Sequence, residues 1–365
     1  MANVLAYGAD PTGVANSTAA IVAAIAATPV SGTVCFPYTA TGGTYLCDSD
    51  QINAAGRRLQ GDAAHASTVS TIKARTAGTA LVVSSSECAV ESLKLDANNL
   101  SQYAISLTNA DRSELLGVEA VNALAWGILI TGGERLYCRG LYAHDNVNGI
   151  RIIGSDNSEF YACAANINDT VGLYVAGVGS GLTANDGNIK WYGGAIDLNT
   201  VGPQVIFDGV LGALFSGPYI EGASPCLQLD NDASNNCFEF LRMVLGDGAG
   251  DYAVNIIAGN QNSFFGCSAP GTNGRRVRLD GVNAVNNSFI GCYRASALAI
   301  DGMTLYFDDG GGGTYSCEQR QAGFTGATAP TEGTWRVGDL VFDSTGANVG
   351  WQCTVAGTPG TWTAF

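Results

Sequence analysis

The sequence predicts an all-β fold, a parallel β-solenoid in which one short unit repeats along the chain. Apolar strands flanked by Gly, Asp or Asn recur from about residue 103, and successive strands mostly start 22 to 27 residues apart. One interval is longer, near 32 residues, and contains the glycine-rich stretch 177–187. Such an interval is the length of one coil, and a repeat array can absorb 365 residues without a second large domain. The first strands of these coils are Tyr103–Leu107, Gly127–Ile130, Gly149–Ile152, Gly172–Val175, Gln204–Phe207, Cys226–Leu229, Ala253–Ile256 and Val277–Leu279.

A second strand follows about ten residues after each first strand and has its own signature, seen in 158–163, 262–267 and 287–292. Coils stack about 4.8 Å apart, so equivalent side chains form ladders. We expect the recurring Phe and Cys to stack inside the solenoid and the Asn to line a turn. Free Cys packs as a small hydrophobic residue. The eleven cysteines, Cys163, Cys267 and Cys292 among them, are therefore predicted to be reduced and structural.

The segment before the coils is predicted to cap the open end of the solenoid, because an uncovered coil exposes apolar interior and unpaired backbone. Ser17 or Thr18 can N-cap a short helix over 18–27, rich in Ala, Ile and Val, and Pro29 ends it.

Toward the other end of the chain, the repeat pattern of the coils is interrupted by the glycines 310–313. The segment after Pro330 alternates apolar residues with turn signals, which predicts a small terminal β module. It holds three of the five tryptophans, Trp335, Trp351 and Trp362. The predicted organisation is a cap with the first coils (1–60), the β-helix (61–309), and a linker with the C-terminal module (310–365).

Composition excludes several classes of function. The formal charge of -15, from 17 basic and 32 acidic side chains, argues against a broad basic surface for nucleic acid or anionic membranes. The N-terminus lacks the basic segment and apolar run of a signal peptide, and no stretch has the length of a membrane span. We therefore expect a soluble chain made in a cytosol. His65, which we interpret as a loop residue, and His144 are the two histidines, so zinc catalysis has few nitrogen ligands.

Three stretches near the N-terminus, 7–21, 32–37 and 43–45, resemble the opening signature of the pectate-lyase-like right-handed β-helix superfamily. They are most similar to its branch of bacteriophage tailspikes and polysaccharide depolymerases. Near the other end, 338–342, 350–353 and 357–362 resemble a short module that closes phage tail proteins. Gly217–Gly222 is similar to a Tyr-Ile-Glu-Gly stretch common in these helices.

The resemblance implies a right-handed winding, a homotrimer, and a place on the virion after synthesis in the cytoplasm of a bacterial host. It implies polysaccharide as a partner, and other tail proteins as further partners. It does not select an activity, because the superfamily contains lyases, glycoside hydrolases, epimerases and inactive binders. A typical tailspike also has an N-terminal attachment domain, whereas this sequence begins almost directly with the cap, which leaves the mode of attachment open.

Aligning the coils predicts one outward column of side chains late in each turn. The column is Glu119, His144, Asp169, Asp197 and Glu221, with intervals of 25, 25, 28 and 24 residues. The register carries an uncertainty of about two residues, so Asp145, Asn166 and Asn168 compete for the same positions.

Paired carboxylates in this column point to glycoside hydrolysis, which needs two carboxyls about 5 Å apart for retention and about 6.5 to 9.5 Å apart for inversion. Neighbouring coils offer the first spacing and alternate coils the second. Asp197 with Glu221 would be an acid and nucleophile, and Asp169 with Glu221 an acid and base. The hydrolase needs no cofactor. The alternative is that the column has no catalytic role, and that an acidic protein presents carboxylates on a solvated face by chance.

A polysaccharide lyase is the alternative activity, and it needs a base together with a cation that stabilises a developing enolate. His144 or Tyr142 would be the base. The cations would come from Arg135, Arg139, Arg151 and Lys190 in the same coils. On an acidic protein, Ca²⁺ held by the carboxylate column would serve as a bridge to an acidic glycan.

Lys190-Trp191-Tyr192 is a candidate sugar-binding stretch one coil before Glu221, since aromatic rings stack on the C–H faces of sugars. Strand alternation points Trp191 and Tyr192 to opposite faces, so one of them should lie outside. The inward one would fill the interior.

Two function classes fit the sequence. One is an enzyme that degrades a cell-surface or extracellular polysaccharide, and the other is a non-catalytic glycan-binding or structural tail protein. Repeated carboxylates and aromatics in the central coils favour the enzyme.

Overall fold

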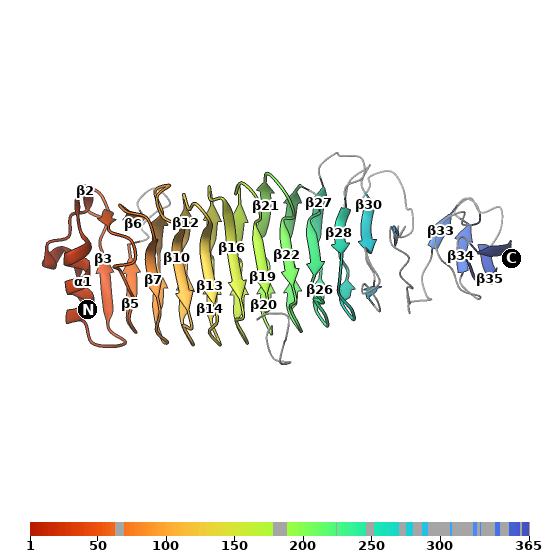
Figure 1. Cartoon of the computed structure of the whole chain (residues 1–365), viewed down its shortest axis with the longest axis horizontal. Helices are drawn as coiled ribbons and strands as arrows, with labels where there is room; N and C mark the ends of the chain where they lie inside the picture. Colours follow the sequence, from red (N-terminus) through yellow and green to blue (C-terminus); the bar gives the residue numbers. More distant parts are fainter. Residues whose placement is uncertain are drawn as a thin grey trace.

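A computed structural model of the chain shows a parallel β-solenoid, in which strands of successive coils lie side by side along one axis (Figure 1). The chain passes through three parallel sheets in turn, of twelve, ten and ten strands, which confirms the predicted all-β solenoid. The described residues are 1–62, 69–177, 188–223, 225–245, 252–269, 275–279, 287–290, 307–308, 324–326, 329, 340–343, 350–357 and 360–364.

We name the sheets A, B and C. Sheet A contains β1 (Ala2–Asn3), β3 (Thr33–Phe36), β5 (Arg58–Gly61), β8 (Ala89–Glu91), β11 (Glu114–Leu116), β14 (Tyr137–Arg139), β17 (Glu159–Tyr161), β20 (Lys190–Tyr192), β23 (Leu214–Ser216), β26 (Cys237–Glu239), β29 (Ser263–Phe265) and β31 (Ser288–Ile290). Sheet B contains β2 (Thr12–Asn16), β4 (Thr44–Cys47), β6 (Ser70–Ala74), β9 (Leu93–Asp96), β12 (Glu119–Val121), β15 (Tyr142–His144), β18 (Ala164–Asn166), β21 (Ala195–Asn199), β24 (Tyr219–Gly222) and β27 (Arg242–Leu245). Sheet C contains β7 (Thr79–Val83), β10 (Tyr103–Thr108), β13 (Trp126–Thr131), β16 (Asn148–Ile153), β19 (Leu173–Ala176), β22 (Val205–Asp208), β25 (Leu227–Asp230), β28 (Tyr252–Ile256), β30 (Arg275–Leu279) and β32 (Phe307–Asp308).

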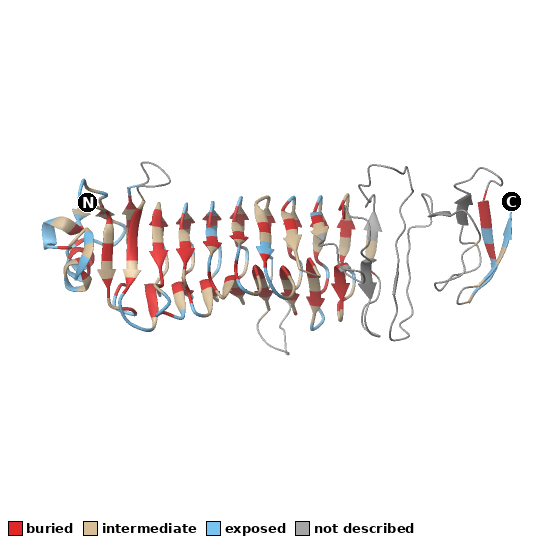
Figure 2. Ribbon diagram, turned by 90° about the horizontal axis from the view of Figure 1, so that it is seen from above, coloured by how far each residue is buried: buried red, intermediate tan, exposed pale blue. Residues whose placement is uncertain are grey.

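The interior is filled by alternate side chains of the strands, because strand residues alternate between the inside and the outside of a coil (Figure 2). On sheet A this gives the predicted aromatic ladder. Its members in register are Phe160, Trp191, Phe215, Phe238 and Phe264, all buried.

Two asparagine ladders satisfy buried polar groups at the corners. The predicted one runs through Asn236, Asn262 and Asn287, with side-chain amides 3.0 Å from the next carbonyl oxygen. A second ladder, which the sequence did not reveal, includes Asn168, whose Nδ2 donates to Asn199 Oδ1 at 2.9 Å. Asn168 is buried, so it is not a candidate for the outward column.

Cys35, Cys47, Cys88, Cys138, Cys163 and Cys237 are free thiols, buried or half-buried in the solenoid, as predicted. Cys163 and Cys267 are buried, while Cys292 lies outside the described residues. Burial raises the pKa of Cys163 to about 12, so this thiol stays protonated.

The predicted cap helix is present as α1 (Thr18–Ala27), at the N-terminal end of the solenoid after the short 3₁₀ helix η1 (Val4–Tyr7) (Figure 1). Ile21, Ala24 and Ile25 belong to the continuous core. Ser17 occupies the N-cap position without capping, because its hydroxyl accepts from Asp10 N at 2.9 Å instead. No described helix is long and apolar enough to cross a membrane.

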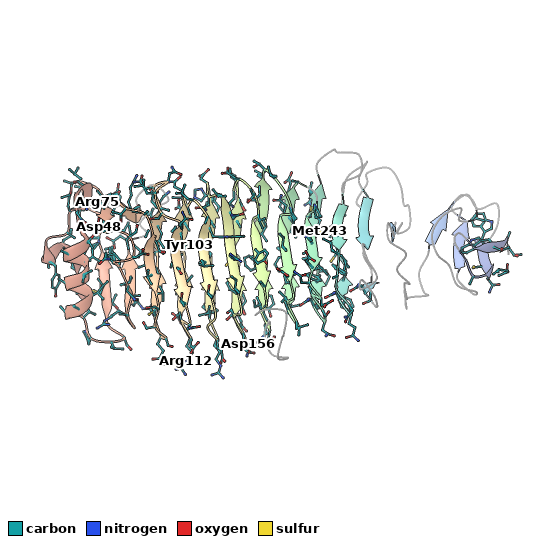
Figure 3. The ribbon with its side chains drawn as sticks, in the orientation of Figure 1. Asp48, Arg75, Tyr103, Arg112, Asp156 and Met243 are labelled. Atoms are coloured by element: carbon teal, nitrogen blue, oxygen red, sulfur yellow. The ribbon has the colours of Figure 1, made fainter. Side chains whose placement is uncertain are left out.

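Ion pairs on the outside link neighbouring coils, for example Arg75 Nε to Asp48 Oδ1 at 2.7 Å (Figure 3). The C-terminal residues form a separate four-stranded sheet, as expected for a small β module. Its strands are β33 (Phe324–Gly326), β34 (Leu340–Asp343), β35 (Gly350–Val355) and β36 (Thr361–Ala364). Trp351 and Cys353 are buried in it, and Trp335 lies outside the described residues.

Candidate functional site

The outward column of sheet B brings together three of the five predicted residues. His144 pairs in register with Asn166, and Asp197 pairs with Glu221 on the neighbouring strand. Ile167 N donates to Asp197 O at 3.1 Å, which sets Asn166 beside Asp197 and completes the column. We name these four residues, His144, Asn166, Asp197 and Glu221, the sheet B column.

Two members of the predicted column lie elsewhere. Asp169 lies beyond the end of β18, exposed in the connection to sheet C, and Asn166 takes its place. Glu119 lies one outward position earlier along its strand, in register with Tyr142. The long connection after β19 lengthens one interval, so spacing alone did not fix the register.

Asp197 and Glu221 form the carboxylate pair of the column. They are register partners on parallel strands, which lie about 4.8 Å apart. Burial, and then the charge of Glu221, raise the pKa of Asp197. Asp197 Oδ1 is buried without a hydrogen-bond partner among the described residues. Both observations disfavour the ionised form of Asp197 relative to a solvated aspartate.

Tyr219 supports the second carboxylate. Its hydroxyl donates to Glu221 Oε2, and this bond is the main cause that raises the pKa of Tyr219 to about 12. The phenol therefore remains a donor at neutral pH. The Arg242 guanidinium carbon lies over the Tyr219 ring, 5.6 Å from its centre, in a cation–π contact.

His144 is held between two carboxylates. Its Nε2 is 3.0 Å from Glu119 Oε1 and its Nδ1 is 2.7 Å from Asp145 Oδ2. Because carboxylates only accept, both nitrogens donate, which is the imidazolium form. The Glu119 hydrogen bond is the main cause that raises the pKa of His144. In turn, His144 and then Lys94 lower the pKa of Glu119 to about 2.

Removing one carboxylate at a time should reveal which of the two, Glu119 or Asp145, raises the pKa of His144 more. Glu119→Gln is expected to lower the pKa of His144 more than Asp145→Asn does, because the Glu119 side chain is 26% exposed and the Asp145 side chain 57%. NMR titration of the imidazole protons measures both shifts. Equal shifts would contradict the assigned order.

The same pair predicts a pH dependence of stability. The pKa of His144 is raised above 6.5, so its contribution is complete below 6.5 and is lost as pH rises through the raised pKa. The pKa of Glu119 falls from 4.5 to about 2, so its contribution is complete above 4.5 and is lost as pH falls toward 2.

The predicted substrate-binding residues divide between the inside and three outer faces. The prediction of Trp191 as a sugar-binding platform was wrong, because this side chain is 1% exposed and packs between Phe160 and Phe215. Tyr192 lies outside on sheet A, as alternation required, with its ring 4.9 Å from that of Tyr161.

The lyase cluster is not assembled on one face. Arg139 lies on sheet A, Tyr142 and His144 on sheet B, and Arg151 on sheet C. Lys190 lies on sheet A, where it pairs with Glu159 at 3.2 Å. Sequence proximity placed these residues together, but each corner of a coil turns the next strand to another face.

Tyr219 and Lys94 are residues of this site that the sequence analysis missed. They occupy the same outward row as Glu119 and Tyr142, two residues before the sheet B column. Strand alternation was the signal, since residues i and i+2 share a face. Among the described residues no group of three or more His, Cys, Asp and Glu side chains could hold a metal ion.

Comparison with known proteins agrees with this architecture. Residues 1–114 match the sequence profile of the family described as "Rhamnogalacturonase A/epimerase, pectate lyase-like". No curated protein sequence matches the chain.

Three solved structures share the fold at low identity. ORF18 of Geobacillus virus E2 is 16% identical, with a TM-score of 0.66 over 100% of this chain and 76% of that one. The A-module of an Azotobacter vinelandii mannuronan C-5 epimerase is 16% identical, with a TM-score of 0.63 over 86% of this chain and 99% of that one. Tailspike protein 2 of an Escherichia coli bacteriophage is 11% identical, with a TM-score of 0.52 over 77% of this chain and 42% of that one. The similarity of this chain to the pectate-lyase-like β-helix superfamily is therefore confirmed, by the family profile over its first coils and by the fold over most of its length.

Proposed function

We propose that this protein is a tailspike-like polysaccharide depolymerase that hydrolyses glycosidic bonds with Asp197 and Glu221. The observation that carries the proposal is the register pairing of these two carboxylates, one of which has a raised pKa. Two titratable groups whose surroundings separate their protonation states are what acid and nucleophile roles require.

The chemistry follows from the two states. Protonated Asp197 gives its proton to the glycosidic oxygen as the bond to the anomeric carbon breaks, while ionised Glu221 bonds to that carbon. Asp197 then removes a proton from the water that displaces Glu221, which restores both groups. The strand spacing of about 4.8 Å favours this retaining route. The alternative pair of an inverting enzyme, Asp169 with Glu221, is not supported, because Asp169 lies outside the column.

A lyase remains the second candidate, because Tyr142 stacks on His144 with ring centres 4.2 Å apart beside Glu119. The structure supports a lyase less well than a hydrolase, because neither candidate base is in the form that would accept a proton. His144 has no free lone pair when both nitrogens donate. Burial and the charges of Asp145, Glu119 and Asp197 raise the pKa of Tyr142, which disfavours the phenolate that would act as base. Ca²⁺ belongs to this alternative alone.

The test is incubation with a panel of bacterial and algal polysaccharides, following reducing ends and ultraviolet absorbance of unsaturated products together. Reducing ends without absorbance support the hydrolase. Both signals would support the lyase, and binding without either would support a non-catalytic tail protein.

The assembly belongs to the same proposal, namely a right-handed solenoid that forms homotrimers on a virion. Small outward side chains on sheet A, such as Ser216 and Ser263, leave room for close packing of copies on a face away from the sheet B column. Light scattering should give three times the chain mass of 37.5 kDa. A stable monomer would remove the trimer.

A further inference from the structure

A second group of outward side chains runs along sheet C, on a different face from the sheet B column. It contains one residue from each of five successive strands, β13, β16, β19, β22 and β25. Register pairing places Arg151 beside Tyr174 and Asp208 beside Asp230. We name these residues, Trp126, Arg151, Tyr174, Asp208 and Asp230, the sheet C strip.

Arg151 sits between two aromatic rings. Its guanidinium carbon lies 5.7 Å from the Trp126 ring centre and 5.1 Å from that of Tyr174. The two rings belong to strands two coils apart, yet their centres are 6.0 Å apart, so they lean over the coil that carries Arg151. This arrangement fixes the guanidinium at the surface.

Arg151 has no carboxylate counter-ion in the described part of the chain. Its Nε is buried without a hydrogen-bond partner, and no carboxylate forms an ion pair with it among the described residues. Several other basic side chains of the described coils, such as Arg58, Lys94 and Lys190, do have carboxylate partners. A partly desolvated cation without a partner is costly unless a ligand supplies one.

The other end of the strip is rich in acceptors. Tyr174 donates its hydroxyl to Asp208 Oδ2, and Asn231 Nδ2 donates to Asp208 Oδ1 at 2.6 Å. Asp230 follows one coil later. Oriented carboxylates and amides of this kind bind sugar hydroxyls, whereas the Arg151 end suits an anion.

We propose that the sheet C strip binds a carboxylate-bearing polysaccharide, with a uronic acid unit on Arg151 and hydroxyl groups of later units on Asp208 and Asp230. A guanidinium fork matches a carboxylate, and the flanking rings offer surface for C–H groups. A pyranose unit has a length similar to the coil spacing, so a glycan along the solenoid axis presents about one unit to each strand. This site does not depend on cleavage at the sheet B column.

Calorimetry in the Glu221→Gln background, which prevents cleavage as the proposed function requires, tests the site. The probes are oligogalacturonate and oligomannuronate, with a maltooligosaccharide as neutral comparison. Arg151→Ala should weaken binding of at least one uronate probe about 10- to 100-fold, the size of a lost charge-assisted contact. Arg151→Lys should restore part of it. Arg139→Ala removes the same charge from sheet A and should leave affinity unchanged.

Each outcome decides the matter. The site is supported if Arg151→Ala weakens uronate binding while Arg139→Ala keeps the original affinity, with the melting temperature unchanged in both variants. The proposal is overturned if both variants lose affinity equally, or if Arg151→Ala keeps its affinity for the uronate probes. It is also overturned if Arg151→Ala weakens binding of the neutral probe as much, or if the Glu221→Gln protein binds no uronate. Because the readout is binding, failure here leaves hydrolysis by Asp197 and Glu221 untouched, and failure of hydrolysis leaves this site standing.

Discussion

Glu221→Gln and Asp197→Asn are each expected to lower turnover by roughly 10² to 10⁴ on whichever glycan the wild-type protein degrades. An amide can neither attack the anomeric carbon as a carboxylate does nor transfer the proton, so either change removes one half of the pair. Folding should survive, because both side chains point outward from sheet B. Initial rates, with thermal melting as a fold control, measure the effect.

Asp169→Asn is the matched control, since it makes the same chemical change on an exposed aspartate outside the column. It should keep wild-type activity. If Asp197→Asn and Glu221→Gln also kept it, the sheet B column would be a solvated face. Asp208 and Asp230, another register pair of carboxylates, would then be the next candidates.

The proposed roles also predict the pH profile. Asp197 must be protonated to act as acid, so the rate should fall as pH rises through its raised pKa. In Glu221→Gln the neighbouring charge is gone, and the pKa of Asp197 should fall. Carboxyl NMR titration checks this shift, and an unchanged pKa would mean that the two groups do not interact.

Trp191→Ala is expected to cause the largest loss of stability, about 3 to 5 kcal/mol in the free energy of unfolding. Trp191 fills the centre of the coil, with its ring 5.3 Å from Phe160 and 5.8 Å from Phe215. Its Nε1 also donates to Gly193 O at 2.9 Å. Each coil contacts only its neighbours, so a cavity here weakens the connection between the two halves of the solenoid.

Tyr192→Ala is the control for this prediction, because it removes an aromatic ring one residue away on the outer face. It should cost far less stability. Denaturant unfolding followed by tryptophan fluorescence and circular dichroism compares the two variants. Weakened glycan binding by Trp191→Ala at unchanged stability would contradict the interior placement.

The sequence by itself determined the coil period, the inward Phe ladder, the bounds of the cap helix at 18–27, and the opposite orientations of Trp191 and Tyr192. It also predicted that Cys163 and Cys267 point inward, but they form no ladder, because Gly194, Pro218 and Leu241 occupy the same position in the coils between them. It also paired Asp197 with Glu221, because the interval of 24 residues between them contains no long insertion. These features follow from local rules, namely the alternation of strand residues and the repetition of nearly equal coils.

The tertiary structure alone decided which residues share an outer face. Alternation says whether a side chain points in or out, but the corners of each coil decide which sheet it joins. Gly140, in the left-handed conformation at φ 62°, turns the chain between Arg139 and Tyr142 and so places them on sheets A and B. The position of each turn likewise set Asn166, and not Asp169, in the column, and it separated Arg151 from the lyase cluster. Such corners depend on the stacking of neighbouring coils, which no single interval in the sequence encodes.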